Sequence, residues 1–209
     1  YEQPRSVANA MAPFIDTDTQ SVKLTNIGFE AETVFKKIDR IIFVACGTSF
    51  YAAMIGKYLI EQICRVPVDT DVASEFRYRR PVIPKNTLVI SISQSGETAD
   101  TLAAVRLAKE QGAELLSITN VAQSSIDREA NGHMYMNSGV EIGVASTKAF
   151  TSTLALLNIL ALQISKARGH LAPVSEKQYV QNLLAVPSQL EVVLAYDKYF
   201  SEAAEKLKK

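Results

Sequence analysis

Short apolar runs alternate with long amphipathic segments from about residue 40 onward. The apolar runs predict five strands, at residues 41–45, 67–71, 87–92, 114–119 and 133–136. The run at 87–92 is almost wholly apolar, which favours a central position in a sheet. Strands that alternate with helices are typical of βαβ units, in which helices cover both faces of a parallel sheet. The pattern therefore predicts an α/β fold.

Helical spacing follows each of these runs. We expect helices at residues 49–63, 74–78, 99–111, 124–129 and 146–167. Gly112 and Gly169 follow two of them, as is usual for helix stop signals. Residues 175–209 also have helical spacing, and Pro187 marks either a kink inside a helix or a break between two. The first forty residues predict one lead-in helix at 29–38, preceded by a loop.

Composition places the chain among globular proteins. It has 209 residues, of which 47% are hydrophobic and 21% are charged, enough for one domain or at most two. The formal net charge is zero, so we expect no nucleic-acid partner. The longest apolar stretch, residues 154–164, is shorter than the roughly 20 residues of a membrane span, so we expect a buried helix and no membrane contact.

Two further features bear on the origin of the chain. Cys46 and Cys64 lie in segments predicted to be buried, which fits a reducing compartment better than a disulfide scaffold and predicts a cytoplasmic protein. The chain opens in a polar segment without an initiator Met, which indicates a piece of a longer protein.

The most informative polar stretch is Ser93-Gln94-Ser95-Gly96-Glu97-Thr98, between the third predicted strand and its helix. A helix N-terminus offers free backbone N–H groups and a partial positive charge. The hydroxyls of Ser93, Ser95 and Thr98 would complete a ring of donors around an anion. The stretch has no lysine, which favours holding a phosphorylated substrate over splitting a nucleotide. Glu97 is either a base or a carboxylate in the first turn of the helix.

A second strand-to-helix corner lies at Cys46-Gly47-Thr48-Ser49. Gly47 allows a tight turn, and Thr48 or Ser49 can cap the helix and donate to an anion; a plain N-cap is the alternative. In open parallel sheets, ligands bind beyond the carboxyl ends of the strands where the winding reverses. If the strand order is 2-1-3-4-5, both corners face one crevice there.

A third candidate is the segment 141–148, which again precedes a helix and offers Ser146 and Thr147 at its start. A well-capped helix start is the alternative, with Glu141 and Lys148 as a surface ion pair of little energetic value.

Other chemistries lack support in the sequence. It contains no dinucleotide fingerprint, no P-loop and no G-x-S-x-G motif, so we expect no nucleotide cofactor and no α/β-hydrolase activity. His133 and His170 lie far apart and outside any ligand-spaced cluster, so we expect no metal site. Cys46 has no paired histidine and is interpreted as a small buried packing residue.

Four motifs closely resemble the isomerase portion of the glutamine–fructose-6-phosphate aminotransferases, which are also called glucosamine-6-phosphate synthases. They are Cys46 to Ser49, Ala73 to Arg79, Ser93 to Thr101 and Gly143 to Thr151, in the same order and spread over most of the chain. The resemblance implies a sugar isomerase (SIS) domain, which is a flavodoxin-like three-layer α/β/α sandwich that binds phosphosugars, with a five-stranded sheet in the order 2-1-3-4-5.

The resemblance also assigns roles to residues. It implies that Ser93, Gln94, Ser95 and Thr98, with Thr48 and Ser49, hold the phosphate of fructose 6-phosphate, and that Val144 and Ser146 contact the sugar. In such enzymes, ammonia from a glutaminase domain replaces the sugar carbonyl oxygen and yields glucosamine 6-phosphate. The family's catalytic base, Schiff-base lysine and ring-opening histidine have no counterpart here, so no catalytic residue is assigned to this chain.

The chain is accordingly interpreted as the first SIS subdomain of such an enzyme, inactive alone. Residues 1–39 form a lead-in segment, residues 40–170 form the phosphosugar-binding domain, and residues 171–209 lead to a second subdomain. The resemblance implies a homodimer, with a glutaminase domain and a second SIS subdomain as further partners. Two alternatives are a phosphosugar-sensing SIS module of a transcriptional regulator and a flavodoxin-like nucleotide-binding module.

Overall fold

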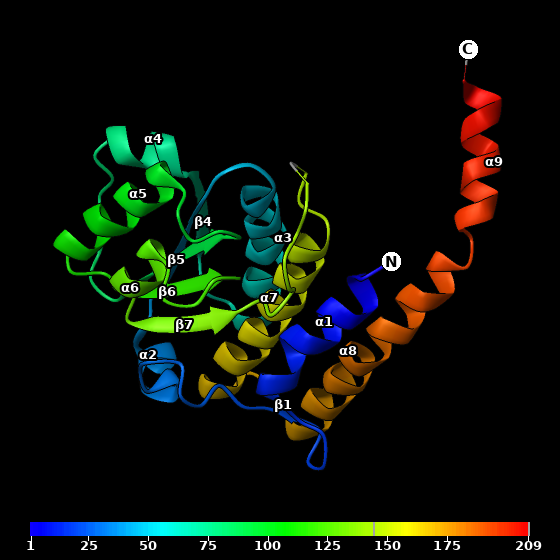
Figure 1. Ribbon diagram of the computed structural model, residues 1–209. Helices are drawn as coiled ribbons and strands as arrows, with labels where there is room; N and C mark the ends of the chain where they lie inside the picture. Colours follow the sequence, from blue (N-terminus) through cyan, green and yellow to red (C-terminus); the bar gives the residue numbers. More distant parts are fainter. Residues whose placement is uncertain (144, 209) are drawn as a thin grey trace.

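The computed structural model describes residues 1–143 and 145–208, and a five-stranded parallel sheet lies at its centre (Figure 1). The strands run in the order β4-β3-β5-β6-β7. In sequence order they are β3 (Arg40–Ala45), β4 (Val68–Val72), β5 (Thr87–Ser93), β6 (Glu114–Thr119) and β7 (Gly132–Tyr135). This is the order 2-1-3-4-5, so the predicted strand order is confirmed.

Helices cover both faces of the sheet because alternate residues of each strand point to opposite sides. Ile41 and Phe43 of β3 belong to the larger core, which is shared with α3 (Gly47–Cys64) and α7 (Lys148–Ala167). Ile42 and Val44 belong to a second core, shared with α4 (Ala73–Tyr78), α5 (Ala99–Glu110) and α6 (Ser125–Glu129). Figure 1 shows these groups of helices on opposite sides of the sheet. The predicted three-layer α/β/α sandwich is therefore confirmed.

Helix α7 is the central helix of the larger core. It has 20 residues, and an 18-residue stretch of it has a mean hydropathy of 1.2, so by length and composition alone it could cross a membrane. In the fold, however, 72% of this segment is buried, and α7 packs against α1, α2 and α3, as expected for a core helix. The helix begins at Lys148, not at Ser146 as predicted. The Glu141 carboxylate accepts the N–H groups of Thr147 and Lys148 and so marks the start of the helix.

The N-terminal forty residues contain more structure than predicted. The helix predicted at 29–38 is present as α2 (Ala31–Lys37), but the residues before it are not a simple loop. They form α1 (Gln3–Met11), a 3-10 turn (Ala12–Phe14) and a two-stranded hairpin of β1 (Ile15–Asp16) and β2 (Ser21–Val22). Helix α1 packs on α7 and α8, and this tertiary burial explains why local sequence signals failed to reveal it.

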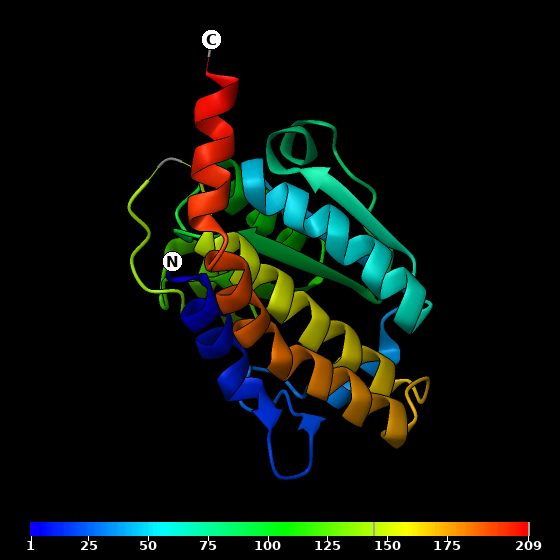
Figure 2. The same ribbon diagram turned by 90° about the vertical axis from the view of Figure 1, so that its right-hand side faces the viewer.

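The C-terminal segment is helical, as predicted. Helix α8 (Pro173–Leu194) contains Pro187 in its interior, so the proline does not separate two helices. The chain turns at Ala195 and Tyr196 instead, before α9 (Asp197–Leu207). Figures 1 and 2 show α9 extending away from the body, and none of its residues is buried.

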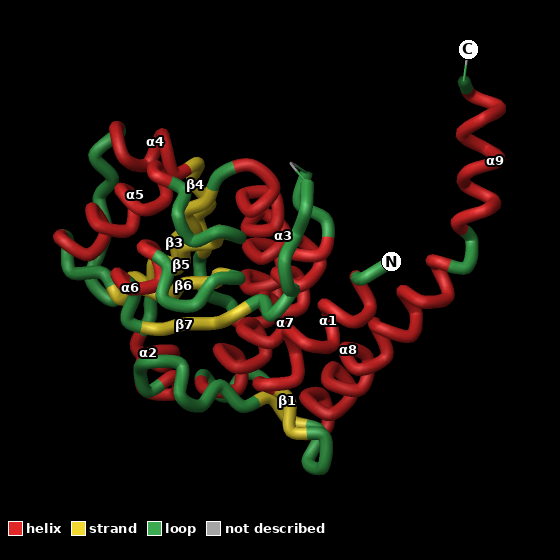
Figure 3. Tube along the Cα trace, in the orientation of Figure 1, coloured by secondary structure: helices red, strands yellow, loops and turns green. Residues whose placement is uncertain are grey.

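All five strands of the main sheet are parallel, so their carboxyl ends share one edge. From that edge, loops lead into α3, α4, α5, α6 and α7 (Figure 3). The candidate residues of the sequence lie in these loops and at the starts of these helices.

Candidate functional site

The first two corners meet at the carboxyl edge of the sheet. Strands β3 and β5 are direct neighbours; α3 begins one residue after β3, and α5 follows β5 after the loop 94–98. The Thr101 hydroxyl, in the first turn of α5, lies 3.9 Å from the Sγ of Cys46, which precedes α3. The two corners therefore lie side by side, as the predicted strand order requires, and that they face one ligand crevice stays a prediction.

The N-terminus of α5 is left open by its own side chains. Thr98 occupies the N-cap position but makes no capping hydrogen bond; its Oγ1 instead lies 3.1 Å from the Oγ of Ser93. Ser93 is only 3% exposed, and its Oγ also accepts a hydrogen bond from the Gly96 N–H at 3.1 Å. With no side chain capping it in the described part of the chain, this helix end retains donors for an anion.

The other two residues of this corner face outward to different degrees. Ser95 is exposed, and its Oγ accepts a hydrogen bond from the Glu97 N–H at 3.2 Å. Gln94 is half-buried, and its backbone carbonyl accepts a hydrogen bond from the backbone N–H of Asn120 at 3.2 Å. The backbone of the loop is thus held by internal bonds, while the Ser95 hydroxyl stays accessible and retains its proton as a donor.

The first corner differs from its predicted form. Helix α3 begins at Gly47 with Cys46 as its N-cap, so the expectation that Thr48 or Ser49 caps the helix is wrong. Both hydroxyl residues are half-buried in the first turn instead. Gly47 has φ +55°, the left-handed conformation that a tight turn requires. Cys46 is half-buried, so the expectation that it is buried is wrong. Cys64 is fully buried, and burial raises the pKa of its thiol to about 12.

Helix α6 supports the second corner from outside. The Ile126 N–H donates to the Gly96 carbonyl at 2.9 Å, and the Ser125 N–H donates to Glu97 Oε1 at 2.7 Å. Glu97 therefore precedes the N-cap of α5 and binds α6, so its interpretation as a carboxylate in the first turn of α5 is wrong. Hydrogen bonds from Ser125 hold the pKa of Glu97 below its usual range. A Cβ at Gly96 would lie 1.9 Å from the Oγ of Ser124, so only glycine fits there.

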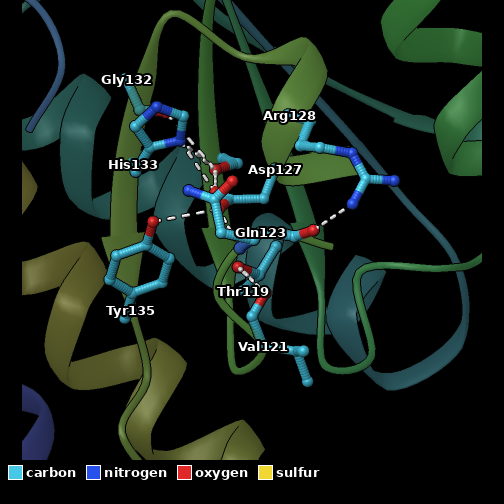
Figure 4. A network of polar contacts seen from close by, with 9 residues as sticks. Thr119, Val121, Gln123, Asp127, Arg128, Gly132, His133 and Tyr135 are labelled. Carbon is cyan, nitrogen blue, oxygen red and sulfur yellow. Dashed lines mark hydrogen bonds and ion pairs between the residues drawn. The ribbon is translucent and has the colours of Figure 1, made fainter. Parts of the chain in front are cut away.

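A buried carboxylate fixes α6 to the edge of the sheet (Figure 4). Asp127 is 1% exposed and accepts hydrogen bonds from Ser117 Oγ at 2.7 Å, the Gln123 N–H at 2.8 Å and the Tyr135 hydroxyl at 3.0 Å. Its Oδ1 also lies 2.8 Å from Nδ1 of His133. Burial alone raises the pKa of Asp127, but these hydrogen bonds outweigh it and hold the pKa below its usual range. Sequence reasoning missed this network.

Among residues 1–143 and 145–208, no three His, Cys, Asp or Glu side chains gather as metal ligands would. The expectation of no metal site stays a prediction.

Asn120 joins the second corner to the third. Its N–H binds Gln94 as described, its side-chain N–H donates to the Gly139 carbonyl at 2.8 Å, and its Oδ1 accepts the Ser138 N–H at 2.8 Å. The segment that leads to α7 is thereby anchored to the loop around Gln94. Sequence reasoning also missed Asn120, although an asparagine at the carboxyl end of a predicted strand is a usable signal.

The third corner is already occupied by a side chain. Glu141 Oε1 accepts the N–H groups of Thr147 at 2.6 Å and Lys148 at 2.8 Å, and Oε2 accepts the Ser146 hydroxyl at 3.2 Å. The alternative interpretation, a well-capped helix start, is therefore confirmed, but Glu141 supplies the cap in place of Ser146 or Thr147. The predicted Glu141–Lys148 ion pair is not present, because the Lys148 ammonium binds Glu2. Val144, predicted to contact the sugar, lies outside the described residues.

Comparison with known proteins assigns this architecture to a family. The sequence profile of the SIS domain family matches residues 34–163. A curated glutamine–fructose-6-phosphate aminotransferase (isomerizing) from Clostridium tetani is 44% identical over 206 residues, which is 99% of this chain and 34% of the relative. The corresponding protein of Haemophilus influenzae is also 44% identical over 206 residues, covering 98% of this chain and 33% of the relative. The chain spans about a third of the length of these curated relatives.

Solved structures agree with this assignment. The C-terminal domain of glucosamine-fructose-6-phosphate aminotransferase from Francisella tularensis superposes with a TM-score of 0.93 at 39% identity, covering 98% of this chain and 57% of that chain. A putative phosphosugar isomerase from Clostridium difficile 630 has the same fold, with a TM-score of 0.81 at 21% identity, covering 98% of this chain and 55% of that chain. The chain belongs to the SIS domain family and is one SIS subdomain of the kind found in the glucosamine-6-phosphate synthases.

Proposed function

We propose that this chain is the fructose 6-phosphate-binding half of the isomerase domain of a glucosamine-6-phosphate synthase. The whole enzyme would make glucosamine 6-phosphate from fructose 6-phosphate and glutamine-derived ammonia. The observation that carries the proposal is the N-terminus of α5, which no side chain caps in the described part of the chain. We assign the phosphate contacts there to Ser93, Gln94, Ser95 and Thr98. This helix end occurs in a chain that is 44% identical to enzymes whose name includes this substrate.

The phosphate would bind at this helix end for electrostatic reasons. The first-turn N–H groups of α5 and the helix dipole favour a dianion, and the exposed Ser95 hydroxyl adds a donor. Thr98 can turn its hydroxyl from Ser93 toward the ligand, because only a neutral hydrogen bond is exchanged. Thr48 and Ser49 would contribute from the first turn of α3, the neighbouring corner.

The segment before α7 would contact the sugar. Its anchoring to the second corner through Asn120 supports this role, which we assign to Ser146 and Val144. Ser146 would have to exchange its bond with Glu141 for one with the ligand, since that hydroxyl is engaged at 3.2 Å.

Chemistry would require parts beyond this chain. We propose that a second SIS subdomain supplies the catalytic residues, that a glutaminase domain supplies ammonia, and that the complete enzyme is a cytoplasmic homodimer. The chain alone is then expected to bind fructose 6-phosphate without converting it.

Isothermal titration calorimetry with fructose 6-phosphate and glucosamine 6-phosphate tests the proposal. Loss of a hydrogen bond to a charged group costs on the order of 1.5 to 3 kcal/mol, so Ser95→Ala should weaken binding about tenfold or more. Ser201→Ala, an exposed serine on α9, is the matched control and should bind like the wild type. Equal affinities for the wild type and Ser95→Ala would contradict the assignment of the phosphate site.

A further inference from the structure

A buried lysine stands at the start of α7. The Lys148 side chain is 8% exposed, and its Nζ lies 2.7 Å from Oε2 of Glu2, whose side chain is 76% exposed. An ammonium group at a helix N-terminus opposes the helix dipole, and burial removes its water. A partner carboxylate is therefore needed, and among the described residues Glu2 is the one that forms an ion pair with it.

Glu2 is held in position to make this contact. It occupies the N-cap position of α1, and its carbonyl accepts the Ser6 N–H at 3.0 Å and the Ser6 hydroxyl at 2.9 Å. Its carboxylate makes no capping bond to α1 and is directed to Lys148 instead. The carboxylate thus connects α1 to the beginning of α7, which lies 146 residues away in the sequence.

Lys148 also lies close to the segment that precedes α7. A Cβ built on Gly139 would be 4.0 Å from Nζ of Lys148, and the Lys148 N–H donates to Glu141 at 2.8 Å. Between this segment and the start of the chain, a cavity of about 210 Å³ is lined by Glu2, Glu141 and Thr147 among others. The cavity keeps the N-terminal residues and the segment before α7 from packing closely on each other at this place. The Glu2–Lys148 ion pair connects the two segments there.

We propose that Glu2 and Lys148 form a latch through which the N-terminal segment sets the position of residues 139–143 and 145–147, and hence the affinity for the sugar part of the ligand. Both are positioning residues. The effect on affinity rests on the function proposed above for Ser146. The effect on the segment itself does not, because it follows from contacts within the chain.

Two measurements on the whole chain test the latch. Glu2→Gln and Lys148→Met each remove one charge with little change in shape. Hydrogen–deuterium exchange should become roughly tenfold faster at the amides of residues 139–143 and 145–147. It should stay unchanged at residues 114–119, whose amides are held by the neighbouring strands β5 and β7. Fructose 6-phosphate should bind roughly tenfold more weakly to both variants, the equivalent of about 1.4 kcal/mol. The double variant should lose no more than Lys148→Met alone, because one contact is removed in each case.

Lys36→Met is the matched control, since Lys36 forms an exposed ion pair with Glu32 at 2.6 Å on α2. This variant should change neither the exchange at residues 139–143 and 145–147 nor the affinity for fructose 6-phosphate. Wild-type exchange in both latch variants would overturn the proposal, as would faster exchange with wild-type affinity. If the wild type binds no fructose 6-phosphate, the proposed function fails, and so does the affinity part of the latch. Faster exchange would then still establish that the pair holds the segment. Glu2→Gln keeps the test valid if Lys148→Met fails to fold, because Glu2 lies at the surface.

Discussion

The N-termini of α5 and α7 look alike in the sequence but differ in the fold. Each helix follows a strand or loop rich in Ser and Thr. At α5 the Thr98 hydroxyl faces Ser93 and caps nothing, so the helix end is open. At α7 the Glu141 carboxylate accepts the N–H groups of Thr147 and Lys148. An anion at the first end would meet no capping side chain among the described residues, whereas at the second it would have to displace a carboxylate.

The two ends also differ in what supports them. The loop before α5 is held closely by α6, where Gly96 contacts Ser124 and Glu97 binds Ser125. The segment before α7 is held by a few polar contacts, from Asn120, Glu141 and Lys148. Under the proposed function, the first end is a preformed phosphate site and the second segment is an adjustable sugar contact. Four predictions test this difference between the two ends.

The largest effect is expected from Gly96→Ala. Its methyl group would lie 1.9 Å from Ser124 Oγ at a residue with φ +68°, so overpacking and backbone strain together should cost about 3 kcal/mol of unfolding free energy. Urea denaturation measures this loss.

Gly139→Ala is the matched control, because Gly139 has a similar φ of +71° but its added Cβ would meet nothing nearer than Lys148 Nζ at 4.0 Å, an ordinary van der Waals distance. Only the backbone strain applies there, so we expect a loss of about 1 kcal/mol. Equal losses at the two glycines would show that the loop before α5 is no more tightly held than the segment before α7.

Asp127→Asn should cost about 2 kcal/mol, because an amide cannot accept all the hydrogen bonds that the buried carboxylate accepts from Ser117, the Gln123 N–H and Tyr135. The pH dependence has a definite sign. The pKa of Asp127 is lowered from 3.8 in the folded state, so its contribution is present at neutral pH and is lost as the pH falls through the folded value.

The wild type should therefore lose more stability than Asp127→Asn as the pH falls from about 5 to about 3, where the unfolded carboxyl group begins to take up its proton. Chemical denaturation at a series of pH values measures this difference. Parallel pH profiles would mean that Asp127 does not support α6 as a charged group.

Glu141→Ala removes the cap of α7 and should lower the unfolding free energy by about 1 kcal/mol. Denaturation measures the loss, and Glu110→Ala, at the last residue of α5, is the control because it caps no helix N-terminus. A loss below about 0.3 kcal/mol, well under that of a typical cap, would indicate that water replaces the carboxylate at no cost.

Thr98→Val should have the smallest effect on stability, below about 0.5 kcal/mol, since the hydroxyl caps nothing and valine preserves the shape. Its effect on fructose 6-phosphate affinity should be about tenfold, because a donor to the phosphate is lost. Calorimetry and denaturation on the same variant separate the two. A stability loss like that of Glu141→Ala would remove the distinction between the helix ends.

Much of this molecule could be predicted from residue patterns because the responsible forces are local or periodic. Alternate apolar residues in the strands and amphipathic spacing in the helices led to the correct sheet order and layers. The two hydroxyl-rich corners were also placed together correctly, since neighbouring parallel strands end at one edge. Helix α1 was missed because its stability comes from burial against α7 and α8.

The sequence by itself determined the α/β sandwich and the positions along the chain of Ser93 to Thr98 and Thr48-Ser49, because these depend on periodicity and on short-range turn chemistry. Only the tertiary structure decided that Asn120 anchors the segment before α7 and that Glu2 pairs with Lys148, because these partners come from different segments of the chain. Glu2 and Lys148 are 146 residues apart and have no local signal, so their pairing depends on how the folded backbone brings them together.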